Sequence, residues 1–198
     1  NFKTASEYFE SPLGHLDQMP QTQALRLCQL AGEAYRELKD FERARKTFER
    51  ARDLDQGSLK AHEQVASLVL ASGDPKDAER LYFEIVRKFA DKVDAPERGR
   101  LLMLHGRAQL AAGSAKKAIE TLKLAIDQRP HDRDVLAALT DAYMGARDWK
   151  EAVSLLQLRT RGVANEGEKF DLLVQIGDVF LEKLRDREAA SQTFVSAL

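Results

Sequence analysis

The residue types that most often act as nucleophiles or metal ligands are few in this chain of 198 residues and lie far apart. There is one cysteine, Cys28, and the four histidines are His15, His62, His105 and His131. No two histidines are four residues apart, the spacing at which one helix face presents two imidazoles to a metal ion. A lone cysteine excludes an intramolecular disulfide and a zinc site built on several thiolates. We therefore expect no catalytic or metal site, no cofactor and no enzymatic activity.

Packing or solvation accounts for each of these residues without any chemistry. His62 and His105 fall inside segments of helical periodicity, on the side that faces a neighbouring helix. Cys28 stands in such a segment where a large apolar residue would fit, so we expect a buried, unreactive thiol. His131 follows a proline in a turn, and His15 lies in a linker without other ligand types beside it. The sequence also lacks a glycine-rich phosphate-binding loop.

The composition favours a folded, all-helical chain. Lys and Arg number 31 and Asp and Glu 32, and the resulting net charge of −1 argues against a general binder of nucleic acids or membrane surfaces. Hydrophobic residues make up 43% of the chain, and Ala, Leu, Glu, Lys and Arg are abundant beside only five prolines. The longest apolar run, residues 135–139, is far too short for a membrane-spanning helix.

The elements that would position any site form a repeating pattern. In each of five segments, a small residue in one helix is followed by an alanine and then a large apolar residue in the next helix. The alanines stand 34, 40, 34 and 38 residues apart, and they are Ala44, Ala78, Ala118, Ala152 and Ala190. Residues 94–97 form a capping box that predicts an early helix start. Residues 162–167 predict a longer loop, and the fifth segment has one extra residue between its helices.

This pattern resembles the tetratricopeptide repeat (TPR) family, whose unit of 34 residues is an antiparallel pair of helices, A and B. The resemblance implies an all-α fold, a right-handed α-solenoid in which helices A line a concave groove and helices B lie mostly outside. The family's Trp is replaced here by Cys28, His62, Leu102 and Leu136, and its closing Pro survives only at Pro130. We expect a single array cut from a longer chain. Its parts are 1–14 (the second helix of a truncated repeat) and the five repeats 22–57, 58–92, 94–130, 132–162 and 168–198.

The small residue of each helix A has a steric reason, because a larger side chain would hold helix B away. These residues are Gly32, Ala66, Gly106, Thr140 and Gly177. The large residue four positions after each marker alanine, such as Phe48, is expected to fill the seam to the next unit. On helix B of the first repeat, Glu42 and Lys46, and likewise Arg45 and Glu49, are expected to pair on a solvated outer face.

Charged residues on the groove side of helices A are the candidates for partner binding. The resemblance implies that the residue after each small one points into the groove, and residues seven positions earlier lie on the same face. The candidates are Arg26, Glu33, Arg36, Lys60, Glu63, Arg100, Arg107, Asp134, Asp141, Asp171 and Asp178. The early candidates are mixed to basic and the late ones acidic, so we expect a protein or peptide partner whose basic or N-terminal segment is steered to the late groove. The alternative is that these are ordinary solvated side chains.

One function known in the family is not supported. Some TPR domains hold the C-terminal carboxylate of a chaperone with Asn and with Lys or Arg on helices A. This chain has only Asn1 and Asn165, and neither lies within an expected helix A. We therefore expect no binding of chaperone tails.

The sequence favours a non-catalytic protein–protein interaction scaffold and leaves two alternatives open. The chain could be a structural spacer whose apolar ends, 2–13 and 194–198, stack on further repeats or self-associate end to end. It could also be an accessory domain of an enzyme whose catalytic part lies outside this chain. Nucleic-acid binding is disfavoured by the acidic late groove. The unpaired thiol favours the cytoplasm, and the periplasm is also compatible.

Overall fold

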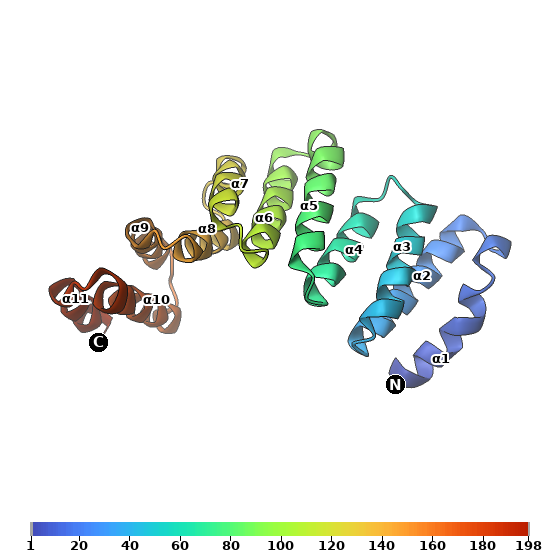
Figure 1. The fold of residues 1–198 in the computed structure, drawn as a ribbon, viewed down its shortest axis with the longest axis horizontal. Helices are drawn as coiled ribbons and strands as arrows, with labels where there is room; N and C mark the ends of the chain where they lie inside the picture. The colour runs from blue at the N-terminus through green and yellow to red at the C-terminus, as the bar shows by residue number, and fades with distance from the viewer. Residues whose placement is uncertain (1, 198) are drawn as a thin grey trace. The chain divides into compact units, whose positions relative to one another are not determined.

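The computed structural model describes the backbone of residues 2–197 and the side chains of residues 8–197, and it is helical without strands over that range (Figure 1). The expected all-α fold is therefore confirmed. The chain forms two compact units, one ending at Lys92 and one starting at Val93. The side chains of Phe2 and Ala5, and all of Leu198, lie outside the described residues, so their part in the expected apolar ends is not described.

The first unit is built from helices that pack against their neighbours in the chain. α2 packs on α3 and α4 on α5, while α1 lies against α2 and α3 against α4. The helices are α1 (Phe2–Leu13), α2 (Gln21–Glu37), α3 (Phe41–Leu54), α4 (Leu59–Ala71) and α5 (Pro75–Phe89), with short 3₁₀ turns η1 (Leu16–Gln18) and η2 (Ala90–Lys92).

The second unit continues the same pairing. α6 packs on α7, α8 on α9, and α10 on α11, and consecutive pairs are joined through α7 with α8 and α9 with α10. The helices are α6 (Ala95–Ala111), α7 (Ala115–Gln128), α8 (Arg133–Gly145), α9 (Trp149–Arg161), α10 (Glu166–Asp178) and α11 (Arg187–Ala197), with a π-helical turn, η3 (Val179–Leu184), after α10.

Side-chain caps set several helix starts. The Asp94 carboxylate accepts a hydrogen bond from the Glu97 amide at 2.9 Å, and α6 begins directly after it, which confirms the early start predicted by the capping box. Asn165 does the same for α10 through the Glu168 amide, also at 2.9 Å. α10 therefore begins at Glu166, two residues before the expected start of the fifth repeat, and the predicted loop 162–167 shortens to four residues.

The turn inside each helix pair has one construction. One residue adopts a left-handed conformation, and the next residue donates its amide back to the end of the preceding helix. The left-handed residues are Lys39, Gly73, Gly113, Arg147 and Arg185. The amide of Asp148 reaches back five residues to the Tyr143 carbonyl, whereas that of Asp186 reaches back six, to Phe180. The extra residue expected in the fifth repeat is thus absorbed as the π-helical turn η3.

The buried small residues allow close contact within each pair. The marker alanines are almost fully buried. A Cβ added at Gly106 would lie 2.5 Å from Cγ of Leu122, and a Cβ at Gly32 would overlap the Phe48 ring. The large residue of helix B therefore fills the space that the glycine leaves within its own pair. The expectation that Phe48 serves the seam to the next unit overlooked this contact, because spacing along one helix does not show which partner its face meets.

Candidate functional site

The first unit offers few unpaired charges among the expected groove residues. Glu33 and Arg36 form an ion pair one turn apart on α2, and Glu33 also accepts a hydrogen bond from Gln64 of α4 at 3.4 Å. Glu63 is half-buried on α4. The exposed cations that remain there are Arg26 and Lys60. One ion pair thus neutralises Glu33 and Arg36, and Arg26 and Lys60 are left as exposed cations of this part of the expected mixed-to-basic surface.

In the second unit, three residues follow the small residue of successive helices A and are exposed. They are Arg107 on α6, Asp141 on α8 and Asp178 on α10. Asp134 and Asp171, two turns before the last two, are also exposed. Arg100 differs, because it is half-buried and pairs with Glu97 of its own helix at 2.6 Å.

Asp141 has the most perturbed carboxyl of this set. Desolvation by surrounding protein atoms raises its pKa, although much of the residue is exposed, while Arg159 and Arg107 lower the pKa.

Arg159 was missed at the level of sequence because it belongs to α9, a helix B that the resemblance assigns to the outside. Its position in the last turn of α9, antiparallel to α8, was the available signal. The late surface is therefore acidic with two flanking guanidiniums rather than uniformly acidic.

A cleft of about 950 Å³ lies where the start of α8, the end of α9 and the start of α10 meet. We name it the Arg159 cleft. Its apolar lining comes from Leu136, Ala137, Leu158 and Val163. Its charged lining includes Asp132, Arg133, Asp134, Arg159, Arg161 and Glu168.

Several of these charges already have partners. The Arg133 guanidinium donates to both carboxylate oxygens of Glu168, at 3.1 and 3.0 Å, and so links α8 to α10. Asp132 caps α8 and pairs with Arg129 at 2.6 Å. Within residues 8–197, Arg159, Arg161 and Asp134 form no ion pair within 4.0 Å.

Two residues that line the cleft differ from the residues at the same positions of the preceding repeat. In the preceding pair, Gly99 of α6 is covered by Arg129, whose Cγ lies 2.6 Å from where a Cβ at Gly99 would stand. Thirty-four residues later the same positions hold Arg133 in place of Gly99 and Val163 in place of Arg129. The long side chain that fills the space is lost, and Arg133 pairs with α10 instead.

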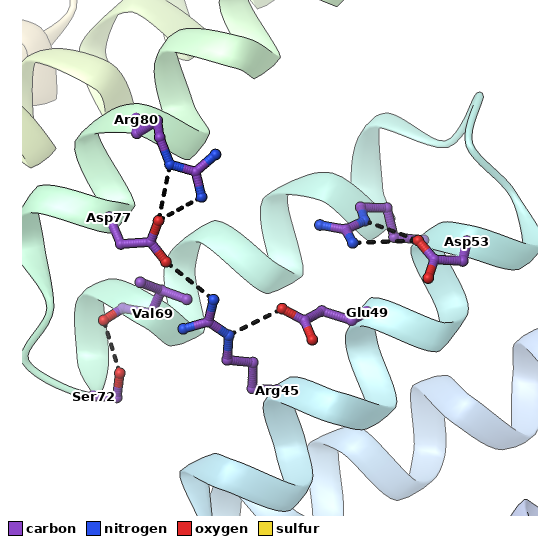
Figure 2. Close-up of polar contacts among 8 residues, drawn as sticks. Arg45, Glu49, Asp53, Val69, Ser72, Asp77 and Arg80 are labelled. Atoms are coloured by element: carbon purple, nitrogen blue, oxygen red, sulfur yellow. Dashed lines mark hydrogen bonds and ion pairs between the residues drawn. The ribbon is translucent and has the colours of Figure 1, made fainter.

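The outer helices of the first unit carry an ion-pair network (Figure 2). The predicted pairs Glu42–Lys46 and Arg45–Glu49 are confirmed, with N–O distances of 2.7 and 3.0 Å. The Arg45 guanidinium of α3 also reaches Asp77 of α5 at 3.1 Å, as Figure 2 shows. Hydrogen bonds from Arg80, helped by Arg45, lower the pKa of Asp77. The expected solvated face therefore also joins two helices.

His62 is held by its neighbours. Its Nδ1 lies 2.8 Å from the Ser58 carbonyl oxygen, which can only accept, so Nδ1 carries the proton. Nε2 is then the acceptor facing the Lys88 ammonium at 3.1 Å. Burial is the main cause that lowers the pKa of His62; Lys88 and Arg52 lower it further, against the Ser58 carbonyl and Asp55. These contacts support the packing interpretation.

The other residues with chemical potential are also placed by packing or by solvent. His105 is buried, and burial lowers its pKa. Cys28 has no exposed surface, and burial raises the pKa of its thiol against the effect of Arg50. His15 is exposed and bonds to the Ser11 carbonyl at 2.9 Å, and His131 is exposed at the Arg159 cleft.

Within the described part of the chain, no group of three or more His, Cys, Asp or Glu side chains is arranged to hold a metal ion. No described helix combines the length and the apolar character needed to cross a bilayer.

Comparison with known proteins gives the family. Three family models, each described as tetratricopeptide repeat, match residues 25–57, 65–133 and 109–173. No curated protein sequence matches the chain.

Several solved structures share the fold. A Podosopora anserina chain of nearly identical TPR-like repeats has 17% identity and a TM-score of 0.74, covering 90% of this chain and 95% of that one. MamA from Desulfovibrio magneticus RS-1, residues 41 to the end, has 15% identity and a TM-score of 0.72 over 88% and 93%. YrrB, a TPR protein with an unusual peptide-binding site, has 17% identity and a TM-score of 0.66 over 97% and 91%.

The sequence matches and the structure agree on the same unit. The matched segments together cover most of the chain, and they coincide with antiparallel helix pairs, left-handed turns and buried small residues. The chain therefore belongs to the tetratricopeptide repeat family.

Proposed function

We propose that this chain is a non-catalytic interaction scaffold whose second unit binds a segment of a partner protein along α6, α8 and α10. The TPR fold suggests a protein–protein interaction scaffold in general, and TPR proteins are typically non-catalytic. The peptide-binding site named for YrrB supports a peptide-like ligand for this fold. The observation that carries the proposal is the set of exposed charges on successive helices A, Arg107 on α6, Asp141 on α8 and Asp178 on α10, with the Asp141 carboxyl acted on by Arg107.

The partner segment proposed for this surface carries basic residues or a free amino terminus. Asp134, Asp171 and Asp178 are exposed carboxylates, and within residues 8–197 they form no ion pair. A cation placed near Asp141 would stabilise its ionised form, which desolvation otherwise disfavours. Complementary charge of this kind mainly steers and orients the partner.

The proposal differs from the carboxylate clamp. Asn165, the one asparagine in the described residues, lies at the start of α10 and uses its side-chain oxygen to cap that helix. Its place outside the body of a helix A supports the expectation that chaperone tails are not the ligand.

The test is an affinity capture with charge-reversed bait. Wild-type chain and an Asp141→Lys, Asp178→Lys variant are used to capture partners from a lysate of the native organism. The control reverses Glu120 and Asp127, two exposed acids of α7, to Lys. We expect a partner that wild type and control retain and that the Asp141 variant binds at least about tenfold more weakly, with a reduced salt dependence. A partner that binds all three equally would contradict the proposed surface.

A second candidate function, self-association through α11, has one observation in its favour. Val195 of α11, a large apolar residue, exposes 68% of its surface. Sedimentation velocity between micromolar and near-millimolar concentrations tests it. A sedimentation coefficient that rises with concentration in wild type, and not in Val195→Asp, would support association; an unchanged coefficient would exclude it.

A further inference from the structure

We propose that the Arg159 cleft binds an acidic side chain and a neighbouring bulky apolar side chain of the partner segment, so that this pair of side chains anchors the segment to the second unit. The inference rests on the proposed function and adds an attachment point to it. A cleft of about 950 Å³ is at the upper end of the range for sites that enclose a compact ligand, so it has room for a few side chains.

The charge of the cleft selects an anion. Its carboxylates Asp132 and Glu168 are already paired, and so is Arg133. The lining charges that form no ion pair are the guanidiniums of Arg159 and Arg161 and the carboxylate of Asp134. Arg159 also acts on the carboxyl of Asp141, so Arg161 is the guanidinium with no carboxylate partner of its own. Guanidinium groups present planar donor pairs that fit a carboxylate, and such charge-assisted hydrogen bonds are stronger than neutral ones.

The apolar lining selects the neighbour of that anion. Leu158 exposes 49% of its surface and lies one residue before Arg159, and Val163 lies two residues after Arg161. An apolar side chain that covers Leu158 would remove apolar surface from water on both partners. The ligand is therefore an acidic residue beside a bulky apolar one.

The carboxylate belongs to an internal side chain rather than to a chain end. Asp134 lines the cleft, and it lies two turns before Asp141 on the same face of α8. Arg159 lines the cleft and also acts on the Asp141 carboxyl. The proposed segment follows this face of α8 between Asp141 and the cleft, and the carboxylate that it places in the cleft is that of an internal side chain.

The probe is a library of random twelve-residue peptides displayed on phage with their C-termini fused to the coat protein, so that only internal carboxylates are offered. The library is selected on the wild-type chain. The enriched peptides are then measured on Arg159→Glu, Arg161→Glu and on a matched control, Lys116→Glu, Lys117→Glu, which makes the same change of net charge on exposed residues of α7 away from the cleft. Circular dichroism verifies that all variants are folded.

We expect enriched peptides in which Asp or Glu adjoins Leu, Ile or Phe, with affinity at least about tenfold lower on the arginine variant and unchanged on the control. A second pair of variants tests the apolar part. Leu158→Asp should weaken the same peptides, whereas Leu124→Asp should not, because Leu124 is the equivalent residue of the preceding repeat, is 55% exposed and does not line the cleft. Amide shifts of Ala137 and Val163 on titration would place the peptide in the cleft.

The opposite results overturn the inference. Enriched peptides without an acidic residue would do so, as would equal affinity for the arginine variant, or a library from which nothing is enriched. Peptides that ignore the arginine variant but are lost on Asp141→Lys, Asp178→Lys would exclude the cleft and leave the proposed function standing. The proposed function itself is decided by the capture experiment and fails independently.

Discussion

The close contact between Gly106 and Leu122 predicts a substitution whose effect on stability has the opposite sign from helix propensity. Replacing Gly by Ala inside a helix normally stabilises a protein by about 1 kcal/mol. At Gly106, however, the new Cβ would lie 2.5 Å from Cγ and 2.8 Å from Cδ2 of Leu122, which has no exposed surface into which it could move. Overpacking of this kind costs about 1–3 kcal/mol. We therefore expect Gly106→Ala to lower the free energy of unfolding by up to about 2 kcal/mol.

A double-variant cycle separates the clash from other effects. Leu122→Ala alone should cost about 2–5 kcal/mol because it empties a buried site. In Gly106→Ala, Leu122→Ala the added methyl group enters that space without a clash, so the double variant should be more stable than Leu122→Ala alone, with a coupling energy of about 1–3 kcal/mol.

Urea titration is the assay, followed by circular dichroism and by the fluorescence of Trp149. Trp149 is the single tryptophan of the chain and begins α9, so its signal reports on the second unit. Two probes are needed because repeat proteins do not always unfold in one step. A stabilised Gly106→Ala variant, or strictly additive energies in the cycle, would refute the packing argument.

Three further predictions concern charge and backbone. The folded-state pKa of His62 lies below its ordinary value, so the unfolded chain takes up the proton first as the pH falls. The contribution of neutral His62 to stability is therefore fully present above about pH 6.5 and is lost as the pH falls through the folded-state pKa. The urea midpoint should drop between pH 7.5 and 5, and it should drop less in His62→Gln. Arg45→Ala should lower the free energy of unfolding by less than about 1 kcal/mol, because the ion pair of Arg45 with Asp77 is part-exposed. The difference in urea midpoint between wild type and Arg45→Ala should shrink in 0.5 M salt, and an unchanged difference would contradict an ion-pair origin. Arg185→Gly should raise the melting temperature, because glycine adopts the left-handed φ of 59° without strain, an effect of up to about 1 kcal/mol. A lower melting temperature would mean that contacts of the arginine side chain stabilise the protein more than its backbone conformation destabilises it.

The features that could be predicted from the sequence are those that recur in every repeat. The all-α fold, the buried marker alanines and the extra residue near Asp186 follow from the spacing of small and large residues, because the same steric problem is solved five times. The expectation that Phe48 fills the seam to the next repeat required more than the spacing of residues along one helix. Periodicity shows which residues share a helix face, whereas the contact with Gly32 depends on how two helices are aligned with each other.

Two interactions between helices were not predicted from the sequence because they are made by long side chains. Assigning residues to an inner or outer face places their Cα atoms, but a guanidinium stands several bonds away from its backbone. Arg159 thus acts on Asp141 from the other helix of its pair, and Arg45 leaves the outer face of α3 to reach Asp77. Asp141 and Asp178 have short side chains and are exposed, and their place on the groove face stays a prediction.

The Arg159 cleft shows why a site in a repeat protein has to be sought where the repeats differ. A shared pattern ensures that every helix pair packs well, and good packing leaves no room for a ligand. At the start of α6, the Arg129 side chain from the end of α7 covers Gly99. One repeat later, Arg133 and Val163 occupy those positions; the covering side chain is lost and two arginines at the end of α9 are left beside an open space. Substitutions at positions outside the shared pattern of small residue, alanine and large residue are therefore the ones that give this chain a surface of its own, and the helix pairs around them supply the frame.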